Sequence, residues 1–187
     1  MDLNLEIDVK LIYGTETGFT KLVGEAILKN FTKTSIVNIE DAEPEDWFSE
    51  LLILGIPTWC EPRLDTFGEY SDDCNNSLDK FKGIDFTGQT VALYGLGDQI
   101  GYADNFVDGL GMLAEVVIKN GGRLIGKTST EGYSWSQSNG LADEDTFFGL
   151  PIDEDNEPTL TYPRIHRWYN NCRMNYDRTN IRLLRNI

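Results

Sequence analysis

The run from Gly14 to Thr20 contains residues that could bind a phosphate. It reads Gly-Thr-Glu-Thr-Gly-Phe-Thr and lies between an apolar, strand-like segment and a helix-like one. The backbone N–H groups in the first turn of a helix have no partner within that helix, so together with the hydroxyls of this run they form an anion site. The run has no lysine or arginine. The negative charge of a phosphate bound here would therefore not be compensated by a cationic side chain of this run.

This turn differs from the common nucleotide-binding loops. It lacks the Gly-Lys-Ser/Thr sequence that binds the outer phosphates of nucleoside triphosphates, and it lacks the Gly-x-Gly-x-x-Gly pattern of dinucleotide sites. One terminal phosphate monoester is the ligand that fits best. The alternative is that Thr17 or Thr20 only caps the helix.

Two later loops carry aromatic residues that could enclose a flat ring. Residues 55–62 read Gly-Ile-Pro-Thr-Trp-Cys-Glu-Pro, with Trp59 directly after a strand, and residues 95–106 read Gly-Leu-Gly-Asp-Gln-Ile-Gly-Tyr-Ala-Asp-Asn-Phe. Glycines let the backbone approach a ligand closely. Trp59 and Tyr102 would form two walls, with Asp98 at the polar edge. A single phosphate, a flat heteroaromatic ring and no catalytic base favour flavin mononucleotide (FMN) over other common cofactors.

The elements that position these loops form an alternating pattern. Strands are expected at 9–13, 36–39, 51–56, 91–94 and 123–126, the last continuing at 147–150, and helices at 21–31, 66–82, 104–120 and 161–174. Strands that are apolar along their whole length predict an α/β fold, a doubly wound parallel sheet of five strands with helices on both faces. Ligands of such sheets bind beyond the carboxyl ends of the strands, where the strand order reverses. The polar stretch 128–146 looks inserted into the last strand, as decoration or as a partner contact.

The three loops together resemble those of the flavodoxins, over residues 7–174. The interrupted last strand is similar to that of the long-chain branch. The resemblance implies the flavodoxin-like strand order 2-1-3-4-5 and non-covalently bound FMN. It implies an FMN site made of the following residues: Thr15, Glu16, Thr17, Gly18, Phe19, Thr20, Pro57, Thr58, Trp59, Cys60, Glu61, Leu96, Gly97, Asp98, Tyr102, Asn105 and Asp155.

Within that site, the resemblance gives the first loop the phosphate, Trp59 and Tyr102 the two faces of the ring, and Gly97 and Asp98 its pyrimidine edge. One departure concerns Cys60-Glu61-Pro62, where the family usually has Gly or Asn at the corner. Pro62 restricts the backbone of Glu61, and cysteine tolerates positive φ poorly. We therefore expect the peptide turn that stabilises the one-electron-reduced flavin to be more costly here.

The function that the resemblance implies is electron transfer without any catalytic residue. The protein would carry one electron at a time, at low potential, between redox partner proteins. The alternative is an FMN-dependent reductase that acts on a quinone or another small acceptor. A flavin-free interaction module with the same fold is a third possibility, which the aromatic pair and the threonine cluster disfavour.

Charge and cysteine content limit the partners. The formal net charge is −15, which argues against nucleic acid or an acidic membrane as a partner and for a basic protein or a cationic ligand. The resemblance implies redox proteins with basic docking surfaces, of the ferredoxin–NADP reductase type or a photosystem or another ferredoxin-dependent enzyme. The carboxylates Asp98, Asp104, Asp108 and 153–155 are expected to form a rim around the flavin edge, unless they are merely solvated. Three widely spaced cysteines predict neither a zinc site nor a disulfide framework, so we expect a reducing, cytoplasmic compartment. No apolar run approaches the roughly 20 residues needed to span a bilayer, so we expect no membrane insertion. We also expect a monomer.

The charge is unevenly distributed along the chain. Residues 164–187 contain six arginines and a single acidic residue, Asp177, whereas the preceding residues are strongly acidic. We expect one FMN-binding domain over 1–174 and a basic C-terminal tail over 175–187. The tail is either a solvated end or a docking arm.

Overall fold

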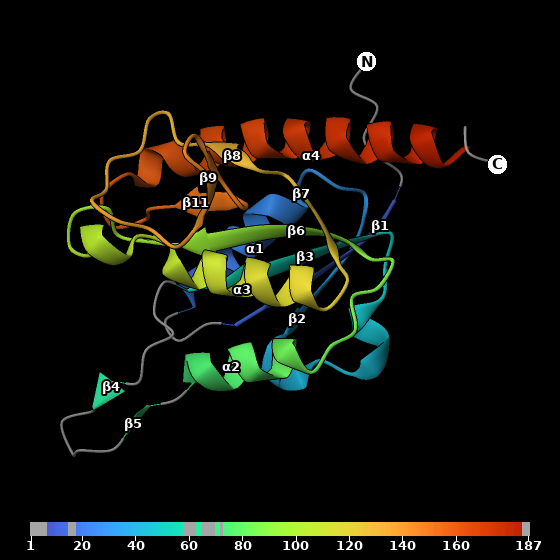
Figure 1. Cartoon of the computed structure of the whole chain (residues 1–187), viewed down its shortest axis with the longest axis horizontal. Helices are drawn as coiled ribbons and strands as arrows, with labels where there is room; N and C mark the ends of the chain where they lie inside the picture. The colour runs from blue at the N-terminus through green and yellow to red at the C-terminus, as the bar shows by residue number, and fades with distance from the viewer. Residues whose placement is uncertain (1–6, 15–17, 58–62, 65–69, 72, 185–187) are drawn as a thin grey trace.

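The computed structural model describes residues 7–14, 18–57, 63–64, 70–71 and 73–184 of the 187-residue chain. Its centre is a parallel sheet in the order β2-β1-β3-β6 (Figure 1). These strands are β1 (Asp8–Tyr13), β2 (Lys33–Asn38), β3 (Leu51–Ile56) and β6 (Thr90–Leu96). The expected flavodoxin-like order is confirmed.

The fifth position of the sheet is shared by two short strands. β7 (Arg123–Ile125) pairs with β6 from Thr90 to Ala92, and β11 (Leu150–Ile152) pairs with β6 from Tyr94 to Leu96. Both are parallel to β6. The last strand is thus interrupted, as predicted, although its second half lies at 150–152 rather than at 147–150.

The chain between these two half-strands forms a small sheet of its own. Its strands are β8 (Thr128–Ser129), β9 (Leu141–Asp143) and β10 (Thr146–Phe147), in the antiparallel order β8-β10-β9. We call residues 126–149 the insertion. Phe147 is fully buried against the main core, so the insertion is anchored to the domain rather than loosely attached.

Helices cover both faces of the main sheet (Figure 1). α1 (Phe19–Leu28) and α4 (Thr161–Leu184) pack against one face, and α2 (Asp73–Lys82) and α3 (Asp108–Lys119) against the other. Alternate residues of β3 go to opposite faces: Ile53 belongs to the α1 and α4 side, and Leu52 and Leu54 to the α2 and α3 side. All six residues of β3 are buried, because both faces are covered.

Two helix boundaries differ from the sequence prediction. α2 begins at Asp73, not at residue 66, and is preceded by the short antiparallel pair β4 (Arg63–Leu64) and β5 (Tyr70–Ser71). Gly68 would destabilise a helix that began earlier, whereas an acidic residue is favourable in a first helical turn.

α4 continues ten residues past the predicted end, from 174 to Leu184. Its buried face runs through Ile165, Trp168, Cys172 and Tyr176 at helical spacing, and Tyr176 contributes to the core. The helix therefore crosses the boundary expected between domain and tail.

Short helical turns complete the chain. They are η1 (Ile39–Asp41), η2 (Pro44–Trp47), η3 (Ala103–Asn105) and η4 (Pro158–Leu160). None of the described helices combines the length and the apolar character that crossing a bilayer requires.

A buried tyrosine of β6 ties the sheet to the first turn of α1. The Tyr94 hydroxyl donates a hydrogen bond of 2.9 Å to the carbonyl oxygen of Thr20. To reach it, the ring passes over Gly55 of β3, where an added Cβ would lie 2.1 Å from the ring Cζ. The hydroxyl also lies against Gly24 of α1. Burial raises the pKa of Tyr94 well above its ordinary value, so the phenol stays a neutral donor.

Tyr94→Phe removes this hydroxyl and leaves the ring in place. We expect the free energy of unfolding in urea to fall by about 1 kcal/mol, because the Thr20 carbonyl loses a buried partner. Tyr169→Phe is the matched control, since the Tyr169 hydroxyl is buried without a partner among the described residues. Its removal should cost nothing or stabilise the protein. Equal losses in the two variants would contradict the role of the Tyr94 hydrogen bond.

Candidate functional site

The three predicted loops begin at the same edge of the sheet. The register pairs Tyr13 with Gly55 and Gly55 with Tyr94, so β1, β3 and β6 end side by side. The Gly14 N–H donates to the Gly55 carbonyl at 3.0 Å. The strand order reverses between β1 and β3, since β2 lies on one side of β1, and β3 and β6 on the other. This is the place where open α/β sheets bind their ligands.

The first loop leads into the N-terminus of α1. Gly18 precedes the helix in the left-handed conformation, at φ 87°, and as a glycine it has no side chain with which to cap the first turn. Among the described residues, no atom lies within 4 Å of where a Cβ on Gly18 would be. The N-terminus of α1 can accept an anion there.

Two further predicted residues of this loop are described. Phe19 is about half exposed and Thr20 is buried. Thr15, Glu16 and Thr17 lie outside the described residues. The nearest cation in sequence, Lys21, belongs to the first turn of α1, and its Nζ lies 3.9 Å from Glu25 Oε1. Glu25 thus offsets part of the charge that Lys21 brings to the helix terminus.

The second loop is described only at its start. β3 ends at Ile56, and Pro57 is half-buried at the carboxyl edge of the sheet. The predicted ring-flanking residues Thr58, Trp59, Cys60 and Glu61 lie outside the described residues, and so does the unusual corner at Pro62.

The third loop is described throughout. It leaves β6 at Leu96 and Gly97, where the Gly97 N–H donates to the Ile152 carbonyl at 2.9 Å. It then turns so that the Tyr102 N–H reaches the Asp98 carbonyl at 3.1 Å. The Tyr102 residue is 39% exposed, which leaves part of its surface available to a ligand.

The Asp98 and Asn105 side chains shape this loop. Asp98 Oδ1 accepts hydrogen bonds from the N–H groups of Ile100 and Gly101 and from the Asn156 amide. Desolvation raises the pKa of Asp98, but these hydrogen bonds outweigh it and hold the pKa below the ordinary value. Asn105 Nδ2 donates to Asp108 Oδ2 at 3.1 Å. Contacts to a ligand from this loop would therefore come mainly from its backbone and from Tyr102.

Asp153, at the end of β11, holds the third loop in place. Its carboxylate is fully buried and accepts bonds from the Gln99 N–H and the Gln99 Nε2, each at 3.0 Å. The N–H groups of Asp155 and Asn156 and the Asn156 amide complete its partners. Desolvation raises the pKa of Asp153, yet the bonds from Gln99 and Asn156 lower it further, so the pKa lies below its ordinary value.

The insertion braces the same loop from the other side. Asn139 N–H donates to Asp108 Oδ1 at 2.7 Å, Ser138 Oγ donates to the Phe106 carbonyl, and Ser134 N–H donates to Gln99 Oε1 at 2.7 Å. Between these contacts Val107 is held at φ 49°, a conformation that costs a β-branched residue about 1–3 kcal/mol. The insertion is thus a structural support of the loop, which its polar sequence did not reveal.

Two members of the expected acidic rim are not at the surface. Asp108 and Asp153 are buried and bonded within the protein, so they cannot take part in a rim. Asp104 and Asp155 are exposed, and Asp98 and Glu154 are partly exposed. Asp155, a predicted cofactor ligand, lies beside the third loop through its neighbours Asp153 and Asn156.

The sequence prediction missed Gln99, Asn156 and Asn139 as supports of the site. The run Asp153 to Asn156 directly after a strand was the available signal, because Asp side chains commonly bond the backbone two or three residues on. Among the described residues, no group of His, Cys, Asp and Glu is arranged to bind a metal ion.

Comparison with known proteins adds sequence relatives. The family model described as flavodoxin matches residues 11–168. The chain is 40% identical over 164 residues to a flavodoxin of Picosynechococcus sp., covering 86% of this chain and 92% of that protein. It is 37% identical over 161 residues to flavodoxin 1 of Escherichia coli K12, covering 84% of this chain and 88% of that protein.

Solved structures of flavodoxins are also similar to this chain. A mutant of the Fusobacterium nucleatum flavodoxin bound to flavin mononucleotide superposes with a TM-score of 0.77 at 33% identity, covering 91% of this chain and 97% of that one. The flavodoxin of the same organism bound to flavin mononucleotide gives a TM-score of 0.74 at 34% identity, covering 88% and 95%.

Asp153→Asn tests how the third loop is held. The amide would present N–H groups to the Gln99 and Asn156 donors, so we expect the free energy of unfolding at pH 7 to fall by about 2 kcal/mol. The folded pKa is depressed, so the carboxylate stabilises the fold above its unfolded pKa of about 3.9, and this contribution is lost as the pH falls. The difference between the native protein and the variant should therefore shrink from pH 7 to pH 3 in urea titrations.

The exposed neighbour provides the control for this experiment. Asp155→Asn should change the free energy of unfolding by no more than about 0.5 kcal/mol. A loss in Asp153→Asn that stays constant with pH would show that the carboxylate charge is not what holds the loop.

Proposed function

This chain belongs to the flavodoxin family, and we propose that it transfers electrons between redox proteins on one non-covalently bound FMN. The observation that carries the proposal is the convergence of three loops at the reversal point of the sheet. One of them leads into the N-terminus of α1, which begins directly after the left-handed Gly18. A phosphate monoester fits that terminus, and a ring fits between the neighbouring loops.

The residues divide between the two ends of the cofactor. Thr15, Thr17 and the N–H groups at the start of α1 would bind the phosphate. Trp59 and Tyr102 would cover the two faces of the ring, and the backbone at Gly97 and Asp98 would meet its pyrimidine edge. Bound FMN supplies a ring that accepts and releases electrons singly. The protein orients that ring and limits the access of water to it.

The charge of the protein favours a low reduction potential. A unit negative charge about 8 Å from the ring opposes the addition of another by about 2 kcal/mol at an effective dielectric constant of 20. Asp104 and Asp155 are exposed on or beside the third loop, and the whole chain has a net charge of −15. Lys21 compensates little of this negative charge, because it is paired with Glu25.

The partners would be proteins with basic docking surfaces, such as a reductase of the ferredoxin–NADP type. Asp98, Asp104 and Asp155 provide the acidic surface beside the site that such partners need. We also propose that the protein acts as a monomer in the cytoplasm. The buried free thiol of Cys172 is compatible with the reducing conditions of that compartment. No feature of the described residues specifically favours the alternative, a quinone reductase.

The cofactor is tested by the colour and affinity of the purified protein. We expect the native protein to be yellow, and Thr17→Ala to weaken FMN binding about tenfold through one lost phosphate contact. Trp59→Ala should weaken it as well, since a wall of the ring is removed. Thr87→Ala, an exposed threonine near the opposite end of β6, is the control. FMN titration with fluorescence detection gives the affinities, and a colourless native protein that fails to bind added FMN would refute the proposal.

The docking surface is tested by salt. Electron transfer from a ferredoxin–NADP reductase should slow about tenfold between low and high ionic strength, because long-range attraction is screened. Asp104→Asn combined with Asp155→Asn should reduce this salt dependence, whereas Asp85→Asn, also exposed, should not. Stopped-flow absorbance measures the rates. Rates that are independent of salt would contradict the docking model, and quinone turnover with NADPH but without the reductase would favour the alternative.

A further inference from the structure

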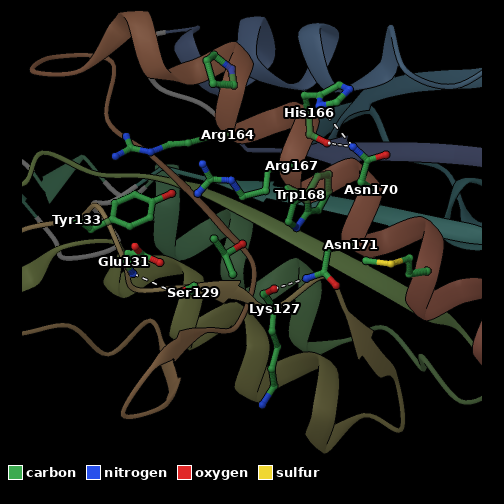
Figure 2. Close-up of a pocket in the computed structure, with 13 residues that line it drawn as sticks. Lys127, Ser129, Glu131, Tyr133, Arg164, His166, Arg167, Trp168, Asn170 and Asn171 are labelled. Atoms are coloured by element: carbon green, nitrogen blue, oxygen red, sulfur yellow. Dashed lines mark hydrogen bonds between the residues drawn. The ribbon is translucent and has the colours of Figure 1, made fainter.

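Two arginines of α4 face the insertion, and their surroundings differ. Both line a cavity of about 670 Å³ between α4 and the insertion (Figure 2). Arg167 is exposed, whereas Arg164 is only 9% exposed. In Figure 2 the Arg164 side chain reaches from α4 to Tyr133, and its guanidinium carbon lies 4.0 Å from the centroid of that ring. A cation buried in this way has to be held by partners, because its removal from water is costly.

The partners of Arg164 come from two different segments. Its Nη2 donates to Glu157 Oε2 at 2.6 Å and to the Gly132 carbonyl at 3.0 Å. Gly132 belongs to the insertion, and Glu157 lies between β11 and α4. The Glu157 side chain is 31% exposed, so burial alone does not fix its position. Arg164 therefore holds the Glu157 carboxylate in place relative to the insertion.

The same carboxylate oxygen also binds the third loop. Glu157 Oε2 accepts a hydrogen bond of 2.6 Å from Gln99 Nε2. That nitrogen donates to Asp153 Oδ2 as well, at 3.0 Å, and Gln99 Oε1 accepts from the Ser134 N–H at 2.7 Å. Carboxylates only accept and a backbone N–H only donates, so these partners allow one orientation of the Gln99 amide. The buried Gln99 side chain is thus fixed from three sides.

This arrangement brings two negative charges to one amide nitrogen. Glu157 and Asp153 both accept from Gln99 Nε2, and like charges at this separation repel each other. Among the described residues, Arg164 is the one cation that forms a salt bridge with either carboxylate. Without it, Glu157 would turn toward water and leave an N–H of Gln99 without an acceptor.

We propose that Arg164 is a positioning residue for the third loop, acting through Glu157 on the Gln99 side chain. Gln99 lies between Asp98 and Tyr102, so its anchoring sets the backbone that would meet the pyrimidine edge and one face of the ring. The consequence for the flavin rests on the proposed function, whereas the consequence for the loop does not.

Arg164→Met tests this role, because it removes the charge and keeps an apolar stem against Tyr133. Amide hydrogen exchange is followed by NMR on the full chain as purified. The N–H groups of Gly101 and Tyr102, both bonded to Asp98, should exchange about tenfold faster as the loop opens locally. The N–H of Gly122, near the opposite end of β6, reports any destabilisation of the whole domain and should change less.

A double-mutant cycle separates positioning from packing. Glu157→Ala breaks the route to Gln99 and leaves Arg164 bonded to Gly132, so it should speed exchange of the same loop amides. In that background Arg164→Met should add little, whereas a residue that only packs α4 against the insertion would give additive effects. Arg164→Lys keeps a cation beside Glu157 and should restore most of the protection. Arg164→Gln takes the place of Arg164→Met in the cycle if the methionine variant does not fold.

Arg167→Met is the matched control, since it makes the same change at the exposed arginine and should leave the loop amides as they are. FMN titration with fluorescence detection should show about tenfold weaker binding in Arg164→Met and no change in Arg167→Met. Unchanged exchange of the loop amides relative to Gly122, additive effects in the cycle, or equal effects in Arg167→Met would overturn the proposal.

The two readouts keep this proposal distinct from the proposed function. Faster loop exchange with unchanged FMN affinity would overturn the role of Arg164 toward the flavin. A native chain that binds no FMN would refute the proposed function, and the exchange rates would still decide whether Arg164 positions the third loop.

Discussion

A buried carboxylate sets the shape of the candidate site. Asp153 has no exposure, and a charge in that position is tolerated only when hydrogen bonds replace its water. The backbone and side chain of Gln99 and the turn from Asp155 to Asn156 supply those bonds. The third loop therefore has to close onto the end of β11, and the positions of Gly97, Asp98 and Tyr102 follow from that closure.

The sequence predicted the sheet and its loops well, because strands such as β3 are apolar at every position and the strand-to-helix turns have distinctive residues. The sequence prediction failed where contacts between distant segments determine which residues are buried. Asp108 and Asp153 look like surface residues in sequence, and only the approach of Asn139 and Gln99 makes their burial possible. The end of α4 was missed because Tyr176 continues the buried face beyond a stretch that is mostly polar. Of the predicted site, the parts at α1 and on the third loop are described, with Thr20, Gly97 and Tyr102 among them, whereas most of the second loop, with Trp59, lies outside the described residues.

The insertion connects the third loop with α4. On one side the Ser134 N–H donates to Gln99 of the third loop and the Asn139 N–H donates to Asp108 at the start of α3. On the other side the Gly132 carbonyl accepts a hydrogen bond from Arg164 of α4. Glu157 makes a further link, since its Oε2 accepts from both Gln99 and Arg164. The long polar stretch is thus neither a simple decoration nor a separate unit, because its contacts extend from the third loop to α4.

The close packing of Tyr94 over Gly55 has an evolutionary consequence. A methyl group at position 55 cannot coexist with the ring, but the conflict belongs to the pair and not to the glycine. A scan of single substitutions would score position 55 as intolerant, whereas the same alanine becomes acceptable once position 94 carries a smaller apolar side chain, at the expense of the bond to Thr20. The two positions are therefore epistatic, and the order in which they change decides which sequences of this fold can be reached from one another.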